Sequence, residues 1–251
     1  MHNEPVALVI GANQGIGLQI AKELASHNFI VLVGSRDLAR GQAAVLEIGS
    51  AAHPVQLSVT DQASVDAATA HIKETFGRLD LLVQNTAISR ANGQTGQSVE
   101  HGARATRPSN VSLDEMRAVR DTNVFGVLSV YQAMLPLLRT TPGARIVNAS
   151  SGVGSLTRNA DPDFAYRGIF GPVYPASKTA LNAITLAMAI ELEPEGIRVN
   201  AVSPGFTKTN FNGYAGTETV EQGAREVIRV AMLGPDAPTG TFTGTDDTVI
   251  R

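Results

Sequence analysis

The sequence predicts an α/β fold in which helices cover both faces of a single, doubly wound parallel sheet. Two observations carry this prediction. Short runs of continuous apolar residues recur along the chain, and a longer segment with apolar residues at helical spacing follows most of them. Strands that alternate with helices of roughly ten or more residues imply right-handed crossovers, which produce a parallel sheet covered on both sides.

The first strand is predicted at residues 6–10 (VALVI), a wholly apolar run typical of strands buried on both faces of a parallel sheet. The loop Gly11-Ala-Asn-Gln-Gly15-Ile-Gly17 follows it and leads into a helical pattern. Glycines let the backbone approach a pyrophosphate, and a helix N-terminus supplies free N–H groups and the positive end of its dipole. A plain glycine turn is the alternative, but the flanking strand and helix favour a dinucleotide-binding Rossmann fold.

The next elements continue this alternation. Strands are predicted at 29–33, 53–59 and 79–83, with one helix that ends near residue 48 and another that runs from Asp61 to about residue 77. Residues 89–110 break the pattern, because they are polar, contain several glycines and lack apolar periodicity. Long loops without regular structure are often functional. Since this loop starts just past the carboxyl end of a strand, we expect it to form a mobile rim of the ligand crevice.

The second half of the chain resumes the pattern. Residues 112–115 (SLDE) resemble a capping box that opens a helix to about residue 138, which Pro136 can kink. A fifth strand at 145–149 precedes an irregular stretch at 152–171. Because Pro175 belongs in a first helical turn, a helix is expected from about residue 172 or 173 to 193. A sixth strand at 197–202, two short helices within 207–233 and an edge strand at 241–243 complete the prediction.

Length and composition restrict the class of protein. The 251 residues suffice for one large domain, predicted to span 1–251, and the formal net charge of −3 gives no indication of nucleic-acid or membrane binding. The chain has no cysteine, which excludes disulfides and thiolate metal sites, and we predict no metal site. The first residues lack the pattern of a signal peptide and no apolar stretch is long enough to span a bilayer, so a cytoplasmic location is expected.

Tyr174 and Lys178 form the strongest candidate catalytic pair, because a spacing of four residues places both side chains on one face of a helix. A free phenol has a pKa of about 10. A nearby ammonium and the positive end of the helix dipole both favour the phenolate, so we expect the pKa of Tyr174 to lie below that of a free phenol. Such pairs also arise by chance, so the other motifs of the chain decide the interpretation.

An ordered set of short motifs runs through the whole chain. It consists of Gly11-x-x-x-Gly15-x-Gly17, Asn85-Thr-Ala87, Asn123, Ser151, Tyr174-x-x-x-Lys178 and Pro204-Gly205. In order and rough spacing the set resembles the short-chain dehydrogenases/reductases. Residues 11–14 and 34–41 are similar to those of the NADPH-dependent carbonyl reductases in that family. Each motif is weak alone, whereas the ordered set is specific.

The resemblance implies a role for each catalytic residue. Tyr174 would donate a proton to the substrate carbonyl, and Lys178 would lower the pKa of Tyr174 and hold the nicotinamide ribose. Ser151 would hydrogen-bond the carbonyl oxygen, and the main chain of Asn123 would fix a water behind Lys178. Standing alone, Ser151 would be interpreted as a turn residue and Asn123 as a packing residue. The implied cofactor-binding residues, besides Tyr174 and Lys178, are Gly11, Asn13, Gln14, Gly15, Ile16, Gly17, Arg36, Arg40, Ser58, Val59, Asn85, Thr86, Ala87, Pro204, Gly205 and Thr207.

The end of the second strand indicates NADP(H) as the cofactor. A carboxylate at this point would accept a hydrogen bond from a ribose 2′-hydroxyl and repel a 2′-phosphate. This chain has Ser35 there, followed by Arg36 and, one helical turn later, by Arg40. A guanidinium suits bidentate phosphate binding. Two solvated arginines at the start of a helix are the alternative.

Two departures from the family pattern concern the cofactor, and two insertions concern the substrate. Thr86 replaces a usual glycine and is expected to crowd the cofactor slightly, and Ser58 replaces a usual aspartate near the adenine, which weakens that contact. The long loop at 89–110 and about ten extra residues before Tyr174 are expected to shape the substrate pocket. Candidate pocket residues are Val153, Leu156, Phe164, Phe206, Phe211 and Tyr214, which suggest a partly apolar ketone or aldehyde.

The leading interpretation is an NADPH-dependent oxidoreductase that reduces a carbonyl compound, with Tyr174 as the proton donor. A dehydrogenase that oxidises an alcohol is the alternative, because the same site serves both directions. A regulator that binds NADP(H) without turnover is disfavoured, because Tyr174 and Lys178 are both present. A homodimer or homotetramer is expected, because members of the family commonly pair through the helices that begin near residues 112 and 174.

Overall fold

The predicted parallel sheet is confirmed in the computed structural model, which describes residues 4–91, 106–245 and 248–250. Within these residues one sheet of seven strands has the order β3-β2-β1-β4-β5-β6-β7. Neighbouring strands pair in parallel throughout. The strands are β1 (Val6–Ile10), β2 (Ile30–Ser35), β3 (Ala52–Gln56), β4 (Leu81–Gln84), β5 (Arg145–Ala149), β6 (Arg198–Val202) and β7 (Phe242–Thr243).

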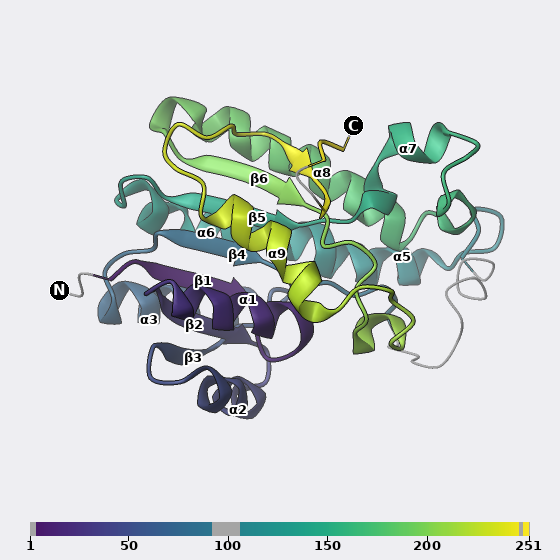
Figure 1. Ribbon diagram of the computed structural model, residues 1–251. Coiled ribbons are helices and arrows are strands. Elements are labelled where there is room, and N and C mark those ends of the chain that lie inside the picture. The colour runs from purple at the N-terminus through teal and green to yellow at the C-terminus, as the bar shows by residue number, and fades with distance from the viewer. Residues whose placement is uncertain (1–3, 92–105, 246–247, 251) are drawn as a thin grey trace.

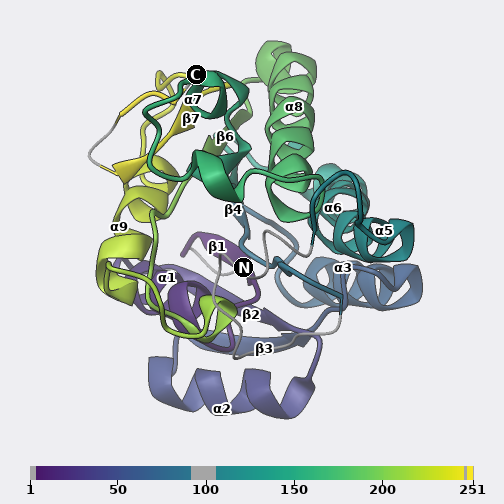
Figure 2. The same cartoon turned by 90° about the vertical axis from the view of Figure 1, so that its right-hand side faces the viewer.

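Helices cover both faces of this sheet. Those in the described residues are α1 (Gly15–Ser26), α2 (Leu38–Ile48), α3 (Gln62–Thr75), α5 (Leu113–Arg120), α6 (Gly126–Arg139), α7 (Leu156–Ala160), α8 (Tyr174–Leu192) and α9 (Val220–Ala231). One buried apolar cluster joins the strands to α3, α6 and α8, and a second joins them to α1, α2 and α9. Figure 2 shows the two groups of helices on opposite sides of the sheet.

The polarity of the sheet determines where a ligand can bind. The arrowheads of β1, β4, β5 and β6 point to the side of the molecule on which α7 and the start of α8 lie (Figure 1). The strand order reverses between β1 and β4, since β2 and β3 lie on one side of β1 and the later strands on the other. In open α/β sheets, ligands bind outside the carboxyl ends of the strands at such a switch point.

The predicted strands are confirmed, all but β1 and β5 with shifted boundaries, and the largest shift concerns the third strand. It was expected to reach residue 59, but β3 ends at Gln56. The chain turns after it, because the Asp61 amide donates to the Ser58 carbonyl and the Ser58 amide donates to Ser64 Oγ. Asp61 then caps α3, accepting from the amides of Ala63 and Ser64.

The predicted long helix from residue 112 is divided in the structure. Ser112 caps α5 by accepting from the Glu115 amide, but a π-helical turn over Asp121–Phe125 separates α5 from α6. In this turn the Gly126 amide donates to the Asp121 carbonyl, five residues back. Such turns often occur at functional sites, and this one carries Asn123. Pro136 lies inside α6.

Two irregular segments have more structure than expected. Residues 152–171 contain α7 and the 3₁₀ turns Gly152–Gly154 and Arg167–Ile169, so the prediction of an irregular stretch is wrong in part. Of the two short helices expected within 207–233, one is a 3₁₀ turn over Asn210–Asn212 and the other is the 12-residue α9. The centre of the 89–110 loop, predicted to be a mobile rim, lies outside the described residues.

Candidate active site

A cleft of about 970 Å³ opens at the carboxyl ends of the strands. The residues predicted for cofactor binding and catalysis that line it are Gly11, Asn13, Gln14, Gly15, Ile16, Arg36, Arg40, Ser58, Val59, Asn85, Thr86, Ala87, Ser151, Tyr174, Lys178, Pro204, Gly205 and Thr207. The fold thus brings together segments that follow six different strands. The two predicted residues that do not line the cleft, Gly17 and Asn123, are both buried.

The candidate catalytic pair stands at the start of α8. Tyr174 is the first residue of this helix, and Lys178 follows about one turn later on the same face. Val173 is the N-cap and Gly171 lies outside the helix, so the helix begins one residue after the expected start. Pro175 occupies the first turn, where its missing N–H is not required. Lys178 Nζ lies 5.7 Å from the centre of the Tyr174 ring.

Burial determines the acid–base properties of both side chains. It raises the pKa of the Tyr174 phenol to about 12, although a hydrogen bond with the Ser151 hydroxyl acts in the opposite direction. Burial also lowers the pKa of Lys178 to about 7. The prediction of a Tyr174 pKa below that of a free phenol is therefore wrong for this structure, because desolvation by burial raises the pKa more than the hydrogen bond with Ser151 lowers it. The phenol keeps its proton at neutral pH.

Close packing around the backbone fixes the position of Lys178. Its side chain is 2% exposed, and Nζ donates to the Ala149 carbonyl at 2.7 Å, at the end of β5. Gly154, in the 3₁₀ turn after β5, lies directly against the helix. A methyl group on Gly154 would lie 2.9 Å from both the Cβ and the carbonyl carbon of Lys178. The absence of a side chain at Gly154 therefore allows α8 to approach this turn.

We expect Gly154→Ala to lower both stability and activity. The added methyl group forces α8 away at Lys178, and such overpacking costs about 1–3 kcal/mol of unfolding free energy. Displacement of the candidate pair lowers kcat as well. Denaturant unfolding and steady-state kinetics measure the two effects. Gly168→Ala is the matched control, because no atom lies within 4 Å of a methyl group there. Equal unfolding free energies for the two variants would argue against the close contact.

Ser151 lies in the cleft beside Tyr174 and Lys178, whereas Asn123 is buried outside the cleft. Ser151 follows β5 and lines the cleft beside Tyr174. Asn123 is 0% exposed, and its amide group forms hydrogen bonds of 2.9 and 2.8 Å with the backbone of Ile88 and donates to Ser177 Oγ at 3.0 Å. The Asn123 side chain thus fastens the segment after β4 to α8. The role of its main chain toward a water stays a prediction.

The loop after β1 has the shape that a pyrophosphate requires. A methyl group on Gly17 would overlap the Gly11 carbonyl oxygen, so only glycine lets α1 pack this closely on the loop. Gly11 has a φ of +75°, and a methyl group there would lie 2.7 Å from Thr86 Oγ1. The Thr86 side chain therefore packs against Gly11. Because the Gln14 side chain does not cap α1, the first N–H groups of this helix remain open to an anion.

The end of β2 presents two exposed arginines to the cleft, Arg36 and Arg40. Asp37 lies between them and caps α2 by accepting from the Arg40 amide at 3.2 Å. Its carboxylate also lies 3.6 Å from Arg40 Nε, so part of the charge of Arg40 is compensated. Arg36 has no ion pair within the described part of the chain. Arg36 is therefore the guanidinium more available to a phosphate.

Aromatic side chains border the cleft near Tyr174. The Phe211 ring lies 5.3 Å from the Tyr174 ring. Tyr166 packs between Phe164, at 5.7 Å, and Phe206, at 6.0 Å. Of the predicted pocket residues, Val153, Phe164, Phe206 and Phe211 line the cleft, whereas Leu156 and Tyr214 do not and are each 61% exposed. The prediction is wrong for these two, because their segments turn the side chains toward solvent.

Sequence reasoning missed two groups of cleft residues. Arg158 reaches the cleft from α7, and a signal for this helix was present, since Ser155 stands at the capping distance of three residues. The second group consists of Gly244, Thr245, Thr248 and Ile250 near the end of the chain. The Ile250 amide donates to the Phe242 carbonyl at 2.7 Å, which returns this segment to the sheet. Its short, polar sequence carries no periodicity that could have indicated this position.

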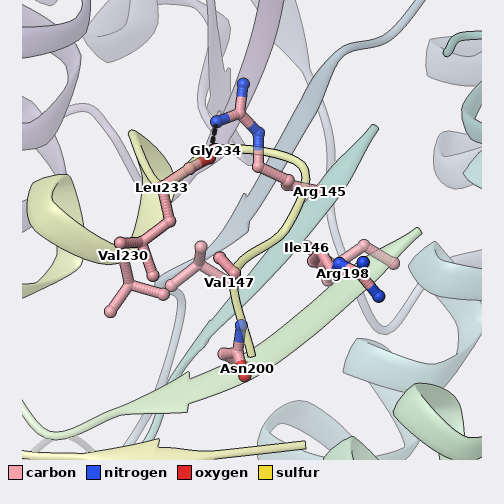
Figure 3. A pocket seen from close by; sticks show the side chains of 9 residues that line it. Arg145, Ile146, Val147, Arg198, Asn200, Val230, Leu233 and Gly234 are labelled. Atoms are coloured by element: carbon pink, nitrogen blue, oxygen red, sulfur yellow. Dashed lines mark hydrogen bonds between the residues drawn. The ribbon is translucent and has the colours of Figure 1, made fainter. Parts of the chain in front are cut away.

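A second, closed pocket lies at the amino ends of β5 and β6, where Arg145 and Arg198 begin their strands (Figure 3). It offers about 0 Å³ to a water-sized molecule. Arg145 donates from Nη1 to the Leu233 carbonyl, and Arg198 donates from Nη2 to the Pro235 carbonyl at 2.7 Å. These hydrogen bonds fasten the segment after α9 to the sheet. The pocket is therefore a structural junction and not a ligand site.

The described residues lack the features that a membrane-spanning helix and a metal site require. Among their helices, none combines the length and the apolar character that a bilayer crossing requires. Nor do their histidine and acidic side chains gather in a group of three or more that could hold a metal ion.

Comparison with family models matches residues 5–219 to the short chain dehydrogenases. Among curated proteins, the short-chain dehydrogenase anuI from Penicillium roqueforti (strain FM164) is 34% identical over 258 residues, which cover 99% of this chain and 97% of that protein. The family match at 5–219 includes every predicted catalytic and cofactor-binding residue, but it ends before the cleft residues Gly244, Thr245, Thr248 and Ile250.

Solved structures show the same similarity. Salutaridine reductase from Papaver somniferum has a TM-score of 0.79 and 30% identity, covering 96% of this chain and 99% of its own. A 3-ketoacyl-(acyl-carrier-protein) reductase from Brucella melitensis, complexed with NADH, has a TM-score of 0.77 and 25% identity, covering 96% of each chain. The second structure is thus of a reductase that holds a nicotinamide cofactor.

Proposed function

The chain belongs to the short-chain dehydrogenase/reductase family, and from this premise we propose that it uses NADPH to reduce a ketone or aldehyde to an alcohol. The observation that carries the proposal is the cleft in which Tyr174, Lys178 and Ser151 share one space with the glycine loop after β1. The names of the similar reductases support reduction as the direction.

The cleft residues divide into groups that would hold the parts of the cofactor. The loop from Gly11 and the first turn of α1 would hold the pyrophosphate through N–H groups. Arg36 would pair with the 2′-phosphate, and Lys178 Nζ would hold the nicotinamide ribose. The segments after β3 and β4 would border the adenosine, and the segment from Pro204 would border the nicotinamide. When bound, the reduced nicotinamide supplies the hydride that the carbonyl carbon receives.

The side chains around Tyr174 supply the proton and stabilise the charge that develops. Tyr174 donates its proton to the carbonyl oxygen, and a pKa of about 12 keeps this proton in place at neutral pH. The Ser151 hydroxyl donates a hydrogen bond to the same oxygen as negative charge builds there. Lys178 stabilises the phenolate that remains, and the main chain of Asn123 would position a water through which the proton returns.

Two other functions remain as alternatives. Alcohol oxidation by the same site would require Tyr174 as a phenolate, a form that burial disfavours because it raises the pKa of Tyr174. A sensor that binds NADP(H) without turnover would not require an ammonium buried beside the phenol. Burial of Lys178 lowers its pKa and therefore opposes folding at neutral pH, which is consistent with selection for catalysis.

The proposal is tested with the purified protein, NADPH and a panel of ketones and aldehydes. We expect NADPH absorbance to fall and the matching alcohol to appear by mass spectrometry. Oxidation of alcohols with NADP⁺ in the absence of any carbonyl reduction would favour the dehydrogenase. Binding of NADPH by calorimetry without turnover in either direction would favour the sensor.

We expect Arg36→Ala to raise the KM for NADPH by about 10- to 100-fold, because hydrogen bonds to charged groups contribute roughly 1.5–3 kcal/mol. The KM for NADH should change little, since NADH has no 2′-phosphate. Arg40→Ala is the matched control and should have a smaller effect, because Asp37 already lies 3.6 Å from Arg40 Nε. Steady-state kinetics with both cofactors measure these values. A wild-type preference for NADH would show that the phosphate assignment is incorrect.

Two further expectations from the sequence stay predictions. One is that residues 1–251 act as a single domain, and the other is that the chain forms a homodimer or homotetramer. Leu186 and Ile190 on α8 are 49% and 64% exposed, and Phe125 in the π-helical turn is 59% exposed. Apolar side chains on these two helices are compatible with pairing through them.

A further inference from the structure

We propose that Arg158 binds a carboxylate on the substrate, so that the protein acts on ketones or aldehydes that carry an acidic group. This inference rests on the proposed function and adds a substrate class to it. It arises from the end of the cleft nearest Ser151, where one arginine stands among aromatic and apolar side chains. No sequence motif pointed to this residue.

The Arg158 guanidinium lies against the backbone of Gly152, next to the candidate catalytic residues. Gly152 directly follows Ser151, and a methyl group on it would lie 3.3 Å from Arg158 Nη1. The guanidinium therefore lies over the residue next to the serine that is proposed to contact the carbonyl oxygen. A carboxylate held by Arg158 would stand on the same molecule as that carbonyl, at the distance of a small substituent.

The short helix α7 holds Arg158 in this place through buried hydrogen bonds. The Arg158 amide donates to Ser155 Oγ at 3.1 Å, which caps the helix. Asn159 is 7% exposed, and its Nδ2 donates to the carbonyls of Val153 and Ser155. Arg167 Nε donates to the Asn159 carbonyl at 3.2 Å. A guanidinium on a fixed backbone loses little freedom when it binds an anion.

The charge of Arg158 has no acidic partner in the part of the protein that the structure describes. Its guanidinium forms no ion pair there, although two carboxylates, Asp37 and Glu218, also line the cleft. The other cations that line the cleft are Arg36, Arg40, Lys178 and Arg90, and Arg90 already has an interaction within the protein. Lys178 donates to the Ala149 carbonyl, and Arg36 and Arg40 follow β2. A half-buried guanidinium in this setting favours a planar oxyanion that accepts two hydrogen bonds.

Three aromatic side chains that line the cleft, Phe164, Tyr166 and Phe206, indicate what the rest of the substrate is like. The Tyr166 ring packs edge to face with Phe164 and at a tilt against Phe206, and the three rings offer apolar area to a ring-bearing substrate. The structure thus combines apolar rings, a proton donor and, in Arg158, a guanidinium that forms no ion pair within the described residues. Together they fit an aromatic keto acid or an aromatic aldehyde acid better than a neutral ketone.

The test uses pairs of substrates that differ by the negative charge and one methyl group: 3- and 4-acetylbenzoate and 3- and 4-formylbenzoate, each beside its methyl ester. We expect wild-type protein with NADPH to prefer at least one acid over its ester in kcat/KM. Arg158→Met should lower kcat/KM for that acid by about 10- to 100-fold, mainly through KM, and change the ester little. Arg158→Lys should lose part of the effect, because an ammonium lacks the planar pair of donors.

The ester reaction also serves as the folding control for each variant. Arg225→Met removes the same charge from the exposed side of α9 and should leave both substrates unchanged. If esters are reduced as well as acids, or Arg158→Met affects both equally, the inference about Arg158 is overturned while carbonyl reduction stands. If wild type consumes NADPH with no member of either series or of the wider carbonyl panel, the proposed function itself is contradicted.

Discussion

Tyr174→Phe is expected to lower kcat for carbonyl reduction by at least about 10²- to 10⁴-fold, the range that a positioned general acid contributes. The variant keeps the ring and its contact with Phe211 at 5.3 Å, so the cleft retains its shape. What it loses is the only phenol at the start of α8 that shares the cleft with Ser151 and Lys178. Single-turnover kinetics with NADPH already bound separate this loss from any change in cofactor affinity.

The matched control for this prediction is Tyr166→Phe. Tyr166 also lines the cleft, but its ring packs between Phe164 and Phe206 and no lysine follows it at helical spacing. Its hydroxyl should therefore be dispensable for proton transfer, and kcat should change by only a few-fold. NADPH should bind both variants with wild-type affinity by calorimetry. Near-normal turnover in Tyr174→Phe would show that Tyr174 is not the proton donor. A large loss of turnover in Tyr166→Phe would indicate Tyr166 as the proton donor instead.

The parts of this molecule that the sequence predicted well are those in which local patterns and tertiary structure agree. The run at 6–10 is wholly apolar and became β1 with the same bounds, because such a run is stable at the centre of a covered sheet. The segment 145–149 also became a strand, β5, with the predicted bounds. Except for Gly17 and Asn123, the predicted cofactor and catalytic residues gather in one cleft, since they lie in segments that follow parallel strands and these strands end on one side.

The π-helical turn shows why local patterns were insufficient elsewhere. The sequence from 112 to 138 has continuous helical periodicity, so nothing in it marks a break at Asp121–Phe125. A π-helical turn contains one residue more than an α-helical turn. Tertiary contacts stabilise it here, because the Asn123 side chain forms hydrogen bonds with the Ile88 backbone and with Ser177. Contacts between residues so distant in sequence cannot be inferred from spacing.

The pKa of Tyr174 was mispredicted for a related reason. The sequence supplies the charges, namely Lys178 and the helix start, but it does not supply the depth of burial. In the structure desolvation is the largest influence on both groups, and it raises the pKa of Tyr174 while it lowers that of Lys178. Arg158 was missed because its importance depends on Gly152, a neighbour that α7 brings close to it.

Lys178→Met is expected to lower kcat by at least about 100-fold and at the same time to change how stability depends on pH. The loss of activity follows because no cation would remain to hold the nicotinamide ribose or to stabilise the Tyr174 phenolate. The variant side chain is similar in length and apolar, so it can fill the same space, where Lys178 is 2% exposed. It gives up one hydrogen bond, to the Ala149 carbonyl, and a hydrogen bond of a charged group contributes roughly 1.5–3 kcal/mol.

The stability effect of Lys178→Met follows from the lowered pKa. Burial lowers the pKa of Lys178 from 10.5 to about 7, so between these pH values the unfolded chain binds the proton and the folded chain releases it. Wild-type stability should therefore rise with pH across this window through Lys178, whereas below about pH 7 the full penalty of the buried charge remains. Urea unfolding of wild type and variant across the window gives a difference curve, in which the variant is the more stable protein at pH 7 and loses that advantage toward pH 10. A flat difference curve would mean that Lys178 has the same pKa in the folded and the unfolded chain. A variant that is less stable than wild type at pH 7 would mean that the hydrogen bond to Ala149 stabilises the fold more than the burial of charge destabilises it.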